Sequence, residues 1–213
     1  MGSLNKGEKQ ETSVSFYNAI ISRMTISMSK PKIALFGYYN YDNWGDNFMA
    51  LVFSSYLKNK DAVFSVFIED AKKRYYTQHI EHISSSLEEF LEDKDLVIYG
   101  GGGALVPRKH DSTSFCGHLK KLLEICRRKK LPIYAISVGG IGNHSKGLVP
   151  PVRKDLFDAL EYVTVRNPQD LLFLKKFNKN GRFYHDILWL TPEFFEIKKS
   201  WIKNSGSGSM FGT

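Results

Sequence analysis

Short apolar runs alternate with amphipathic segments through most of this chain. Runs of about four to eight apolar residues, bounded by charged residues or glycine, are typical of strands buried on both faces. They predict strands at 32–39, 62–68, 95–100, 133–138, 162–166 and 183–188. Apolar residues spaced three or four apart predict helices between them, at 47–58, 84–91, 115–130, 150–160 and 168–177. This alternation predicts right-handed crossovers in a doubly wound, mainly parallel α/β sheet.

Several of the predicted strands end in glycine, at Gly37, Gly100 and Gly139. The carboxyl ends of parallel strands meet at one edge of a sheet, and open α/β sheets bind ligands at that edge. The loops at 38–46, 100–114 and 139–149 should therefore line one crevice. The alternative explanation is that these glycines only serve turns with positive φ.

The length and composition indicate one large domain with a polar tail at each end. A chain of 213 residues with 42% hydrophobic residues can bury a substantial core. We predict a folded domain at 31–197, with flexible tails at 1–30 and 198–213 that are rich in serine, glycine or lysine. The chain has no apolar run of about 18 residues and its first 30 residues lack a signal-peptide core. A cytoplasmic location is expected.

The net charge and the cysteine and histidine content indicate which partners and which metal or thiol chemistry to expect. The net charge of +8 favours anionic partners such as phosphates, nucleic acid or an anionic membrane surface. The basic run at 127–130 is read instead as a solvated helix end, where cations suit the helix dipole. Cys116 and Cys126 are interpreted as reduced thiols, since two cysteines form no disulfide framework or zinc site. His79 and His82 are better explained by a solvated face than by a metal site, so no metal is expected.

The first glycine-edge loop differs from the usual nucleotide-binding loops. Neither GxGxxG nor GxxxxGK[ST] follows the first strand, which argues against a dinucleotide site or a P-loop. The loop at 38–46 instead combines tyrosines, asparagines and Trp44 with the pair Gly45-Asp46 at a helix start. Stacking faces and amide groups of this kind suit hydroxyl-rich ligands. The alternative is that Asp46 acts only as the N-cap of the helix.

Five motifs along the chain resemble those of the polysaccharide pyruvyl transferase family. They occur in the family's order and approximate spacing over about residues 32 to 195, and they read YYNYDNWGD at 38–46, DLVIYGGGG at 95–103, SVGGIG at 137–142, VTVR at 163–166 and HD at 185–186. The resemblance implies transfer of an enolpyruvyl group from phosphoenolpyruvate to a sugar hydroxyl of a cell-surface polysaccharide or its precursor. Phosphate is released, and no organic cofactor is implied.

The same resemblance implies a GT-B-like architecture of two Rossmann-like domains, of which this chain is expected to be the amino-terminal one. Family members place further arginine and histidine contacts on a second domain, for which we find no counterpart after Phe195. A missing carboxyl-terminal domain or an oligomer partner is therefore expected to complete the site. The acceptor is compatible with a lipid-linked saccharide and peripheral association at the inner membrane face, and no nucleic acid is expected.

The donor's chemistry selects the candidate residues. A carboxylate and a phosphate require fixed cations and unpaired backbone amides. Arg166 supplies a planar fork at a strand end, and the glycines at the strand ends are expected to supply the amides. Ketal formation also moves protons, for which Asp46, His185 and Asp186 are the candidates. The expected catalytic residues are Asp46, Arg166, His185 and Asp186; the expected substrate-binding residues are Asn43, Gly45, Gly101, Gly102, Gly103, Gly140 and Gly142. The alternatives are that His185 is buried and that Arg166 merely pairs with a carboxylate.

Two other functions remain open from the sequence. One is a saccharide- or nucleotide-binding Rossmann-like module that performs no chemistry. The other is a domain of a GT-B glycosyltransferase that uses a nucleotide sugar.

Overall fold

The computed structural model describes residues 30–39, 43–69, 76–77, 80–103, 105, 113–140, 151–175, 177 and 181–195. The predicted tails lie outside these residues, except for Lys30. Within the described ranges, no helix combines the length and the apolar character needed to cross a membrane.

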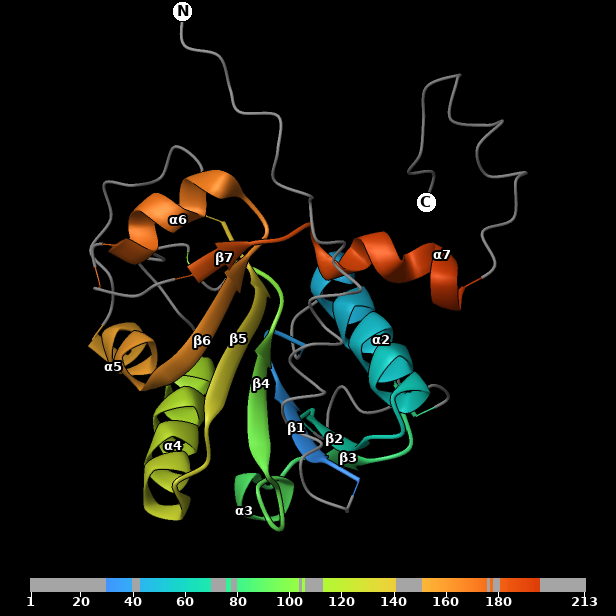
Figure 1. Cartoon of the computed structure of the whole chain (residues 1–213). Coiled ribbons are helices and arrows are strands. Elements are labelled where there is room, and N and C mark those ends of the chain that lie inside the picture. Colours follow the sequence, from blue (N-terminus) through green and yellow to red (C-terminus); the bar gives the residue numbers. More distant parts are fainter. Residues whose placement is uncertain are drawn as a thin grey trace, which may run out of the picture.

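Seven parallel strands form one sheet (Figure 1). In chain order they are β1 (Lys32–Phe36), β2 (Val63–Phe67), β3 (Ile83–Ser84), β4 (Leu96–Gly100), β5 (Ile133–Val138), β6 (Leu160–Val165) and β7 (Gly181–Phe183). Their order across the sheet is β3-β2-β1-β4-β5-β6-β7. The predicted doubly wound α/β fold is confirmed, with one strand more than predicted.

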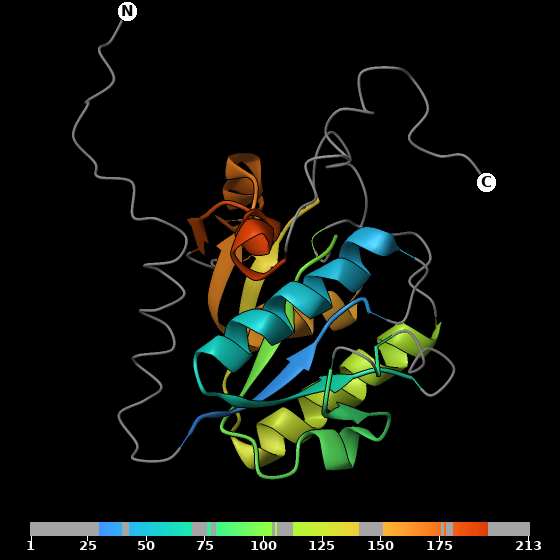
Figure 2. The same cartoon turned by 90° about the vertical axis from the view of Figure 1, so that its right-hand side faces the viewer.

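Helices cover both faces of this sheet, and α2 lies on the face opposite to α4 and α5 (Figures 1 and 2). A short 3-10 helix, η3, joins α2 on its side. The helical elements are α2 (Trp44–Asn59), α3 (Leu87–Phe90), α4 (Thr113–Lys129), α5 (Pro151–Ala159), α6 (Pro168–Lys175), η3 (Ile187–Leu190) and α7 (Thr191–Phe194). Cys116 and Cys126, which were predicted to be reduced thiols, both lie on α4, and neither forms a disulfide.

The central strands explain the uninterrupted apolar runs. On β1, Ile33 and Leu35 pack into the core beneath α2, whereas Ala34 and Phe36 pack into the core beneath α4. All four are buried. Because successive side chains of a strand point to opposite faces, a strand covered on both sides needs apolar residues at every position.

At two predicted boundaries the observed element is of another type than predicted. Ile83 and Ser84 pair with β2 as an edge strand, although the pattern predicts that a helix begins at 84. The last strand ends at Phe183 instead of extending to 188. There the Asp186 carboxylate accepts a hydrogen bond from the Leu188 backbone amide and starts η3. A side chain that bonds its own backbone in this way competes with sheet pairing.

The topology identifies where a ligand site is expected. After β1 the chain continues to β2 on one side, and after β3 it returns to place β4 on the other side of β1. Such a reversal leaves a crevice outside the carboxyl ends of the two central strands. The glycines at 37 and 100–103 follow or end those strands.

Candidate functional site

The crevice between β1 and β4 is closely packed, because its glycines let backbone and side chains approach. A Cβ atom on Gly37 would lie 2.5 Å from the Gly100 carbonyl oxygen. A Cβ atom on Gly100 would lie 2.6 Å from the hydroxyl of Tyr39, which donates to the Gly100 carbonyl at 2.9 Å. The buried Tyr39 side chain therefore occupies space that a larger residue at 100 would need.

Asn43 and Asp46 form a polar group at the start of α2. Asn43 is the N-cap, and its side-chain oxygen accepts from the Gly45 backbone amide at 3.1 Å. Its amide nitrogen donates to Asp46 Oδ2 at 2.8 Å. The prediction that Asp46 caps the helix is wrong, because Asp46 lies in the first turn and is buried against the backbone of Gly102. A Cβ atom on Gly102 would lie 2.7 Å from Asp46 Oδ1.

The glycine amides already have protein acceptors. Gly101 N donates to the Ile136 carbonyl at 2.9 Å, and Gly102 N donates to Met49 Sδ at 3.2 Å. The amide of Gly140 donates to Asp170 Oδ2 at 3.3 Å. Unpaired amides at these positions were expected, and that expectation is wrong. Gly101 and Gly102 have φ of 72° and 73°, so positive φ explains part of the glycine run. Gly103 is half-buried, and Gly142 lies outside the described residues.

Arg166 and Asp186 meet at the ends of β6 and β7. Arg166 Nη1 lies 2.8 Å from Asp186 Oδ2, and the two side chains are 29% and 19% exposed. The other carboxylate oxygen of Asp186 accepts from Ser137 Oγ at 3.3 Å and from the Leu188 amide at 3.1 Å. Ser137 Oγ in turn accepts from the Ile187 amide at 3.0 Å. The alternative that Arg166 pairs with a carboxylate is thus realised, and the pair is held from several sides.

Gly139 brings the two polar groups together. Its amide donates to the Gly102 carbonyl at 3.1 Å, which joins the end of β5 to the backbone against which Asp46 packs. A Cβ atom on Gly139 would lie 2.7 Å from Arg166 Cγ and 3.0 Å from Asp170 Oδ2. Among the described residues, the edge therefore gathers the guanidinium of Arg166 and the carboxylates of Asp46, Asp170 and Asp186.

Three residues of this edge were not predicted from the sequence to belong to the site. Ser137 is buried with a positive φ of 56°, and Asp170 is fully buried beside Gly139. The hydroxyl of Tyr76 lies 2.7 Å from the Tyr39 carbonyl oxygen and 2.6 Å from Asn47 Oδ1. The only signal for Asp170 was its position in the first turn of a predicted helix. Ser137 begins the SVGGIG motif but was not assigned a role, and Tyr76 gave no signal, because the partners of both residues lie far away in the sequence.

Two buried tyrosines near Asp46 have raised pKa values. Burial raises the pKa of Tyr39 well above its ordinary value, and the negative charge of Asp46 raises it further. The same two causes, in the same order, raise the pKa of Tyr76. Both phenols therefore stay protonated at neutral pH and act as hydrogen-bond donors beside the carboxylate.

His185 lies outside the hydrogen-bonded network around Asp186. It is exposed, so the alternative of a buried histidine is wrong. Its ring lies 5.6 Å from the Phe183 ring and 5.8 Å from the Trp189 ring, measured between centroids. Beside it is a pocket of about 410 Å³ lined by Asp186, Leu188, Trp189, Thr191 and Pro192. Trp44, the other tryptophan at this edge, is exposed and stacks on Phe48 with centroids 5.0 Å apart.

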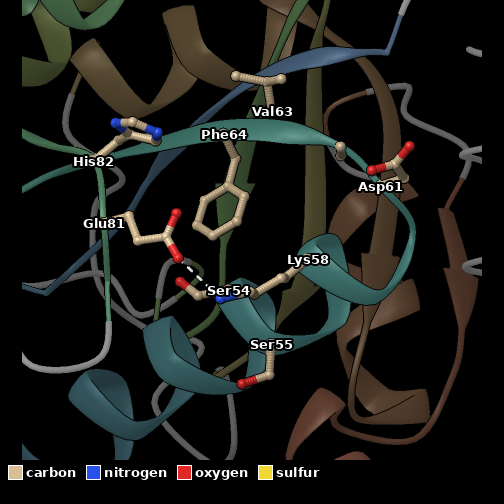
Figure 3. Close-up of a pocket in the computed structure, with 9 residues that line it drawn as sticks. Ser54, Ser55, Lys58, Asp61, Val63, Phe64, Glu81 and His82 are labelled. Atoms are coloured by element: carbon tan, nitrogen blue, oxygen red, sulfur yellow. Dashed lines mark hydrogen bonds and ion pairs between the residues drawn. The ribbon is translucent and has the colours of Figure 1, made fainter.

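A second hollow lies beside β2, at the opposite end of that strand from the glycine edge. Figure 3 shows Lys58 and Glu81 pointing toward each other across this pocket of about 220 Å³, with an Nζ to Oε1 distance of 2.8 Å. His82 lines it, whereas His79 lies outside the described residues. Within the described ranges, no group of three or more His, Cys, Asp or Glu residues could hold a metal ion. This pocket contains none of the predicted site residues.

Comparison with known proteins gives one match. A family model described as polysaccharide pyruvyl transferase matches residues 43–209 of the chain. No curated protein and no solved structure matches. The matched range begins at the helix cap Asn43 and includes Asp46, Arg166 and Asp186.

Proposed function

The chain belongs to the polysaccharide pyruvyl transferase family, and from this premise we propose that it transfers an enolpyruvyl group from phosphoenolpyruvate to a saccharide hydroxyl. The observation that carries the proposal is the fixed, partly exposed guanidinium of Arg166 at the carboxyl edge of the sheet. A planar fork at such an edge suits a carboxylate or a phosphate. Gly139, without a side chain, leaves room for that fork.

Asp186 acts in this proposal as the residue that positions Arg166. Its carboxylate receives Arg166 on one oxygen and both Ser137 Oγ and the Leu188 amide on the other. A carboxylate held by three hydrogen-bond donors keeps the guanidinium in one orientation. This reduces the conformational entropy that is lost when phosphoenolpyruvate binds. The ion pair uses one of the five N–H groups of the guanidinium, so others can serve the donor anion.

Proton transfer completes the proposed reaction. The methylene carbon of phosphoenolpyruvate gains a proton and becomes a methyl group, a sugar oxygen bonds to the adjacent carbon, and the bond from that carbon to the phosphate oxygen breaks. When a second sugar hydroxyl closes the ketal, the two hydroxyl protons end on the methyl group and on the released phosphate. The exposed imidazole of His185 is the group we assign to these proton transfers, since an imidazole can both donate and accept a proton. Asp46 is the second candidate.

The charge balance predicts weak donor binding by the described edge. Arg166 is accompanied there by the carboxylates of Asp46, Asp170 and Asp186, and the donor is itself an anion. Repulsion between these carboxylates and the anionic donor reduces affinity unless further cations take part. We therefore propose that cations beyond the described residues complete the donor site. A GT-B-like second domain, a cytoplasmic location and the absence of an organic cofactor remain predictions.

The test is a titration of the full chain with phosphoenolpyruvate, followed by NMR. Replacing Arg166 by Ala should weaken binding by about 1.5 to 3 kcal/mol, the value of a charge-assisted hydrogen bond. Arg166→Lys should recover only part of the loss, since it keeps the charge without the fork. Arg128→Ala is the matched control, because this exposed arginine ends α4 at the opposite edge. Equal affinities for the wild type and Arg166→Ala would remove Arg166 from the site.

The same charge balance favours a second candidate function. Three carboxylates and one guanidinium among the described residues of this edge suit a neutral, hydroxyl-rich ligand better than an anion, as in a saccharide-binding module without chemistry. If the folded wild type fails to bind phosphoenolpyruvate but binds a saccharide, this second function is the better description.

A further inference from the structure

We infer that the pocket beside Asp186 binds a pyranose ring of the saccharide acceptor, and that Trp189 provides the stacking face. This inference rests on the proposed function, because it assigns the acceptor side of the same site. The pocket is defined by residues of η3 and α7, together with Asp186.

The exposure of Trp189 is the first observation. Its side chain is 73% exposed, although tryptophan is usually well buried in a folded domain. The backbone beneath it is nevertheless fixed. The Trp189 amide donates to the Asp186 carbonyl at 2.9 Å, and Ile187 and Leu190 on either side are buried beneath α2. A rigid segment thus presents a large aromatic surface to solvent.

The shape and chemistry of the pocket favour a sugar. Its volume of about 410 Å³ falls within the usual range for small-molecule sites, roughly 300 to 1,000 Å³. The face of an indole ring is electron-rich and attracts the polarised C–H groups on the face of a pyranose. Asp186 and Thr191 belong to the same lining. The Thr191 hydroxyl donates to the Leu188 carbonyl, so its oxygen can still accept a hydrogen bond from a sugar hydroxyl.

The position of the pocket links it to the proposed donor site. Asp186 is a wall of the pocket and also holds Arg166, with Oδ2 2.8 Å from Nη1. The ring of His185, to which we assign proton transfer, lies 5.8 Å from the Trp189 ring. A sugar stacked on Trp189 would therefore present its hydroxyls between the His185 imidazole and Arg166, the residue proposed to bind phosphoenolpyruvate.

The experiment is a titration of the full chain, without phosphoenolpyruvate, with methyl β-D-galactopyranoside. This sugar gathers C–H groups on one ring face. Binding is read by NMR from the Trp189 indole N–H and from the backbone amides of Leu188 and Thr191. We expect saturable shifts with a Kd of about 1 mM or weaker, as for a single small ring. Galactitol, which has similar hydroxyls but no ring, should cause none.

Three variants separate stacking from general surface effects. Trp189→Ala should raise the Kd by about tenfold or more, and Trp189→Phe should recover part of the affinity. Leu172→Ala is the matched control, because it removes another exposed large hydrophobic side chain, on α6, and should change the Kd by less than about twofold.

Two outcomes would overturn the inference. One is the absence of shifts at Leu188, Trp189 and Thr191 with the folded wild type. The other is a change in molecular mass in solution on replacing Trp189, without any response to the sugar, which would show that a second copy of the chain covers the pocket. Because the sugar titration contains no donor, its failure is distinguishable from failure of the donor titration.

Discussion

Replacing Ser137 by alanine and by glycine separates a hydrogen-bonding role from a backbone role at the centre of the site. Ser137 is only 1% exposed and adopts a φ of 56°, which is unfavourable for any residue with a Cβ atom. Its hydroxyl accepts from the Ile187 amide at 3.0 Å and lies 3.3 Å from Asp186 Oδ1. Its own amide donates to Thr164 Oγ1 at 2.8 Å. Strained positions of this kind are typical of functional sites.

The two variants should differ in a predictable order of stability. Ser137→Ala leaves the buried Ile187 amide without its acceptor, which should cost about 1 to 3 kcal/mol of unfolding free energy. Ser137→Gly loses the same hydroxyl but relieves a left-handed strain of about 1 to 2 kcal/mol. Glycine also has more conformational freedom in the unfolded chain, which lowers the free energy of unfolding by about 0.4 to 1 kcal/mol and offsets part of that gain. The glycine variant should therefore be more stable than the alanine variant by roughly 0.5 to 1 kcal/mol.

Urea unfolding of the wild type and both variants measures these differences. Ser65→Ala is the control, because this buried serine of β2 makes only a long contact of 3.5 Å with the Phe90 carbonyl. An alanine variant as stable as the wild type would refute the role of the hydroxyl. A glycine variant less stable than the alanine variant would refute the strain. Both variants should also weaken phosphoenolpyruvate binding, since Asp186 loses a donor that helps it orient Arg166.

Two further changes test other parts of this edge. Gly139→Ala should displace Arg166, because the new Cβ would lie 2.7 Å from its Cγ and 2.8 Å from its Nε. Phosphoenolpyruvate affinity should fall nearly as far as in Arg166→Ala, and unchanged affinity in a folded variant would contradict this geometry. Tyr76 should weaken the fold at alkaline pH, because burial and the charge of Asp46 raise its pKa above the ordinary value of about 10. The stabilisation by the Tyr76 hydroxyl is fully present below a pH of about 10, the ordinary tyrosine pKa, and is lost as the pH rises further. Tyr76→Phe should therefore reduce the fall in the free energy of unfolding at alkaline pH.

The sequence predicted the sheet well because its signals are local. A strand covered on both faces, such as β5, needs an uninterrupted apolar run, and its boundaries were predicted without error. The glycine edge followed from parallel topology alone. The end of β7 was missed, since it depends on Asp186 bonding to the Leu188 amide instead of continuing the strand. Edge strand β3 was missed because two residues carry no periodicity.

The site was harder to predict because its hydrogen bonds join distant segments. Arg166 and Asp186 were both expected at the edge, but nothing in their spacing says that they pair with each other. The glycine amides were expected to face a ligand, yet the Gly102 amide donates to the sulfur of Met49, 53 positions earlier. A composition rich in glycine indicates close approach of backbone, but it does not say which group approaches.

The arrangement of charges suggests how one edge can hold both substrates. The described residues of this edge include one arginine and three carboxylates, which together attract an anion weakly, but the carboxylates are not equivalent. Asp46 and Asp170 pack against the glycine backbone of 102 and 139–140, whereas Asp186 lies between the guanidinium and the pocket of Trp189. Asp186 can therefore orient Arg166 with one oxygen while its side chain borders the acceptor pocket. Replacing it by asparagine keeps the shape but removes the charge, so the loss should fall on the orientation of Arg166, and hence on donor affinity, more than on stacking of a sugar against Trp189.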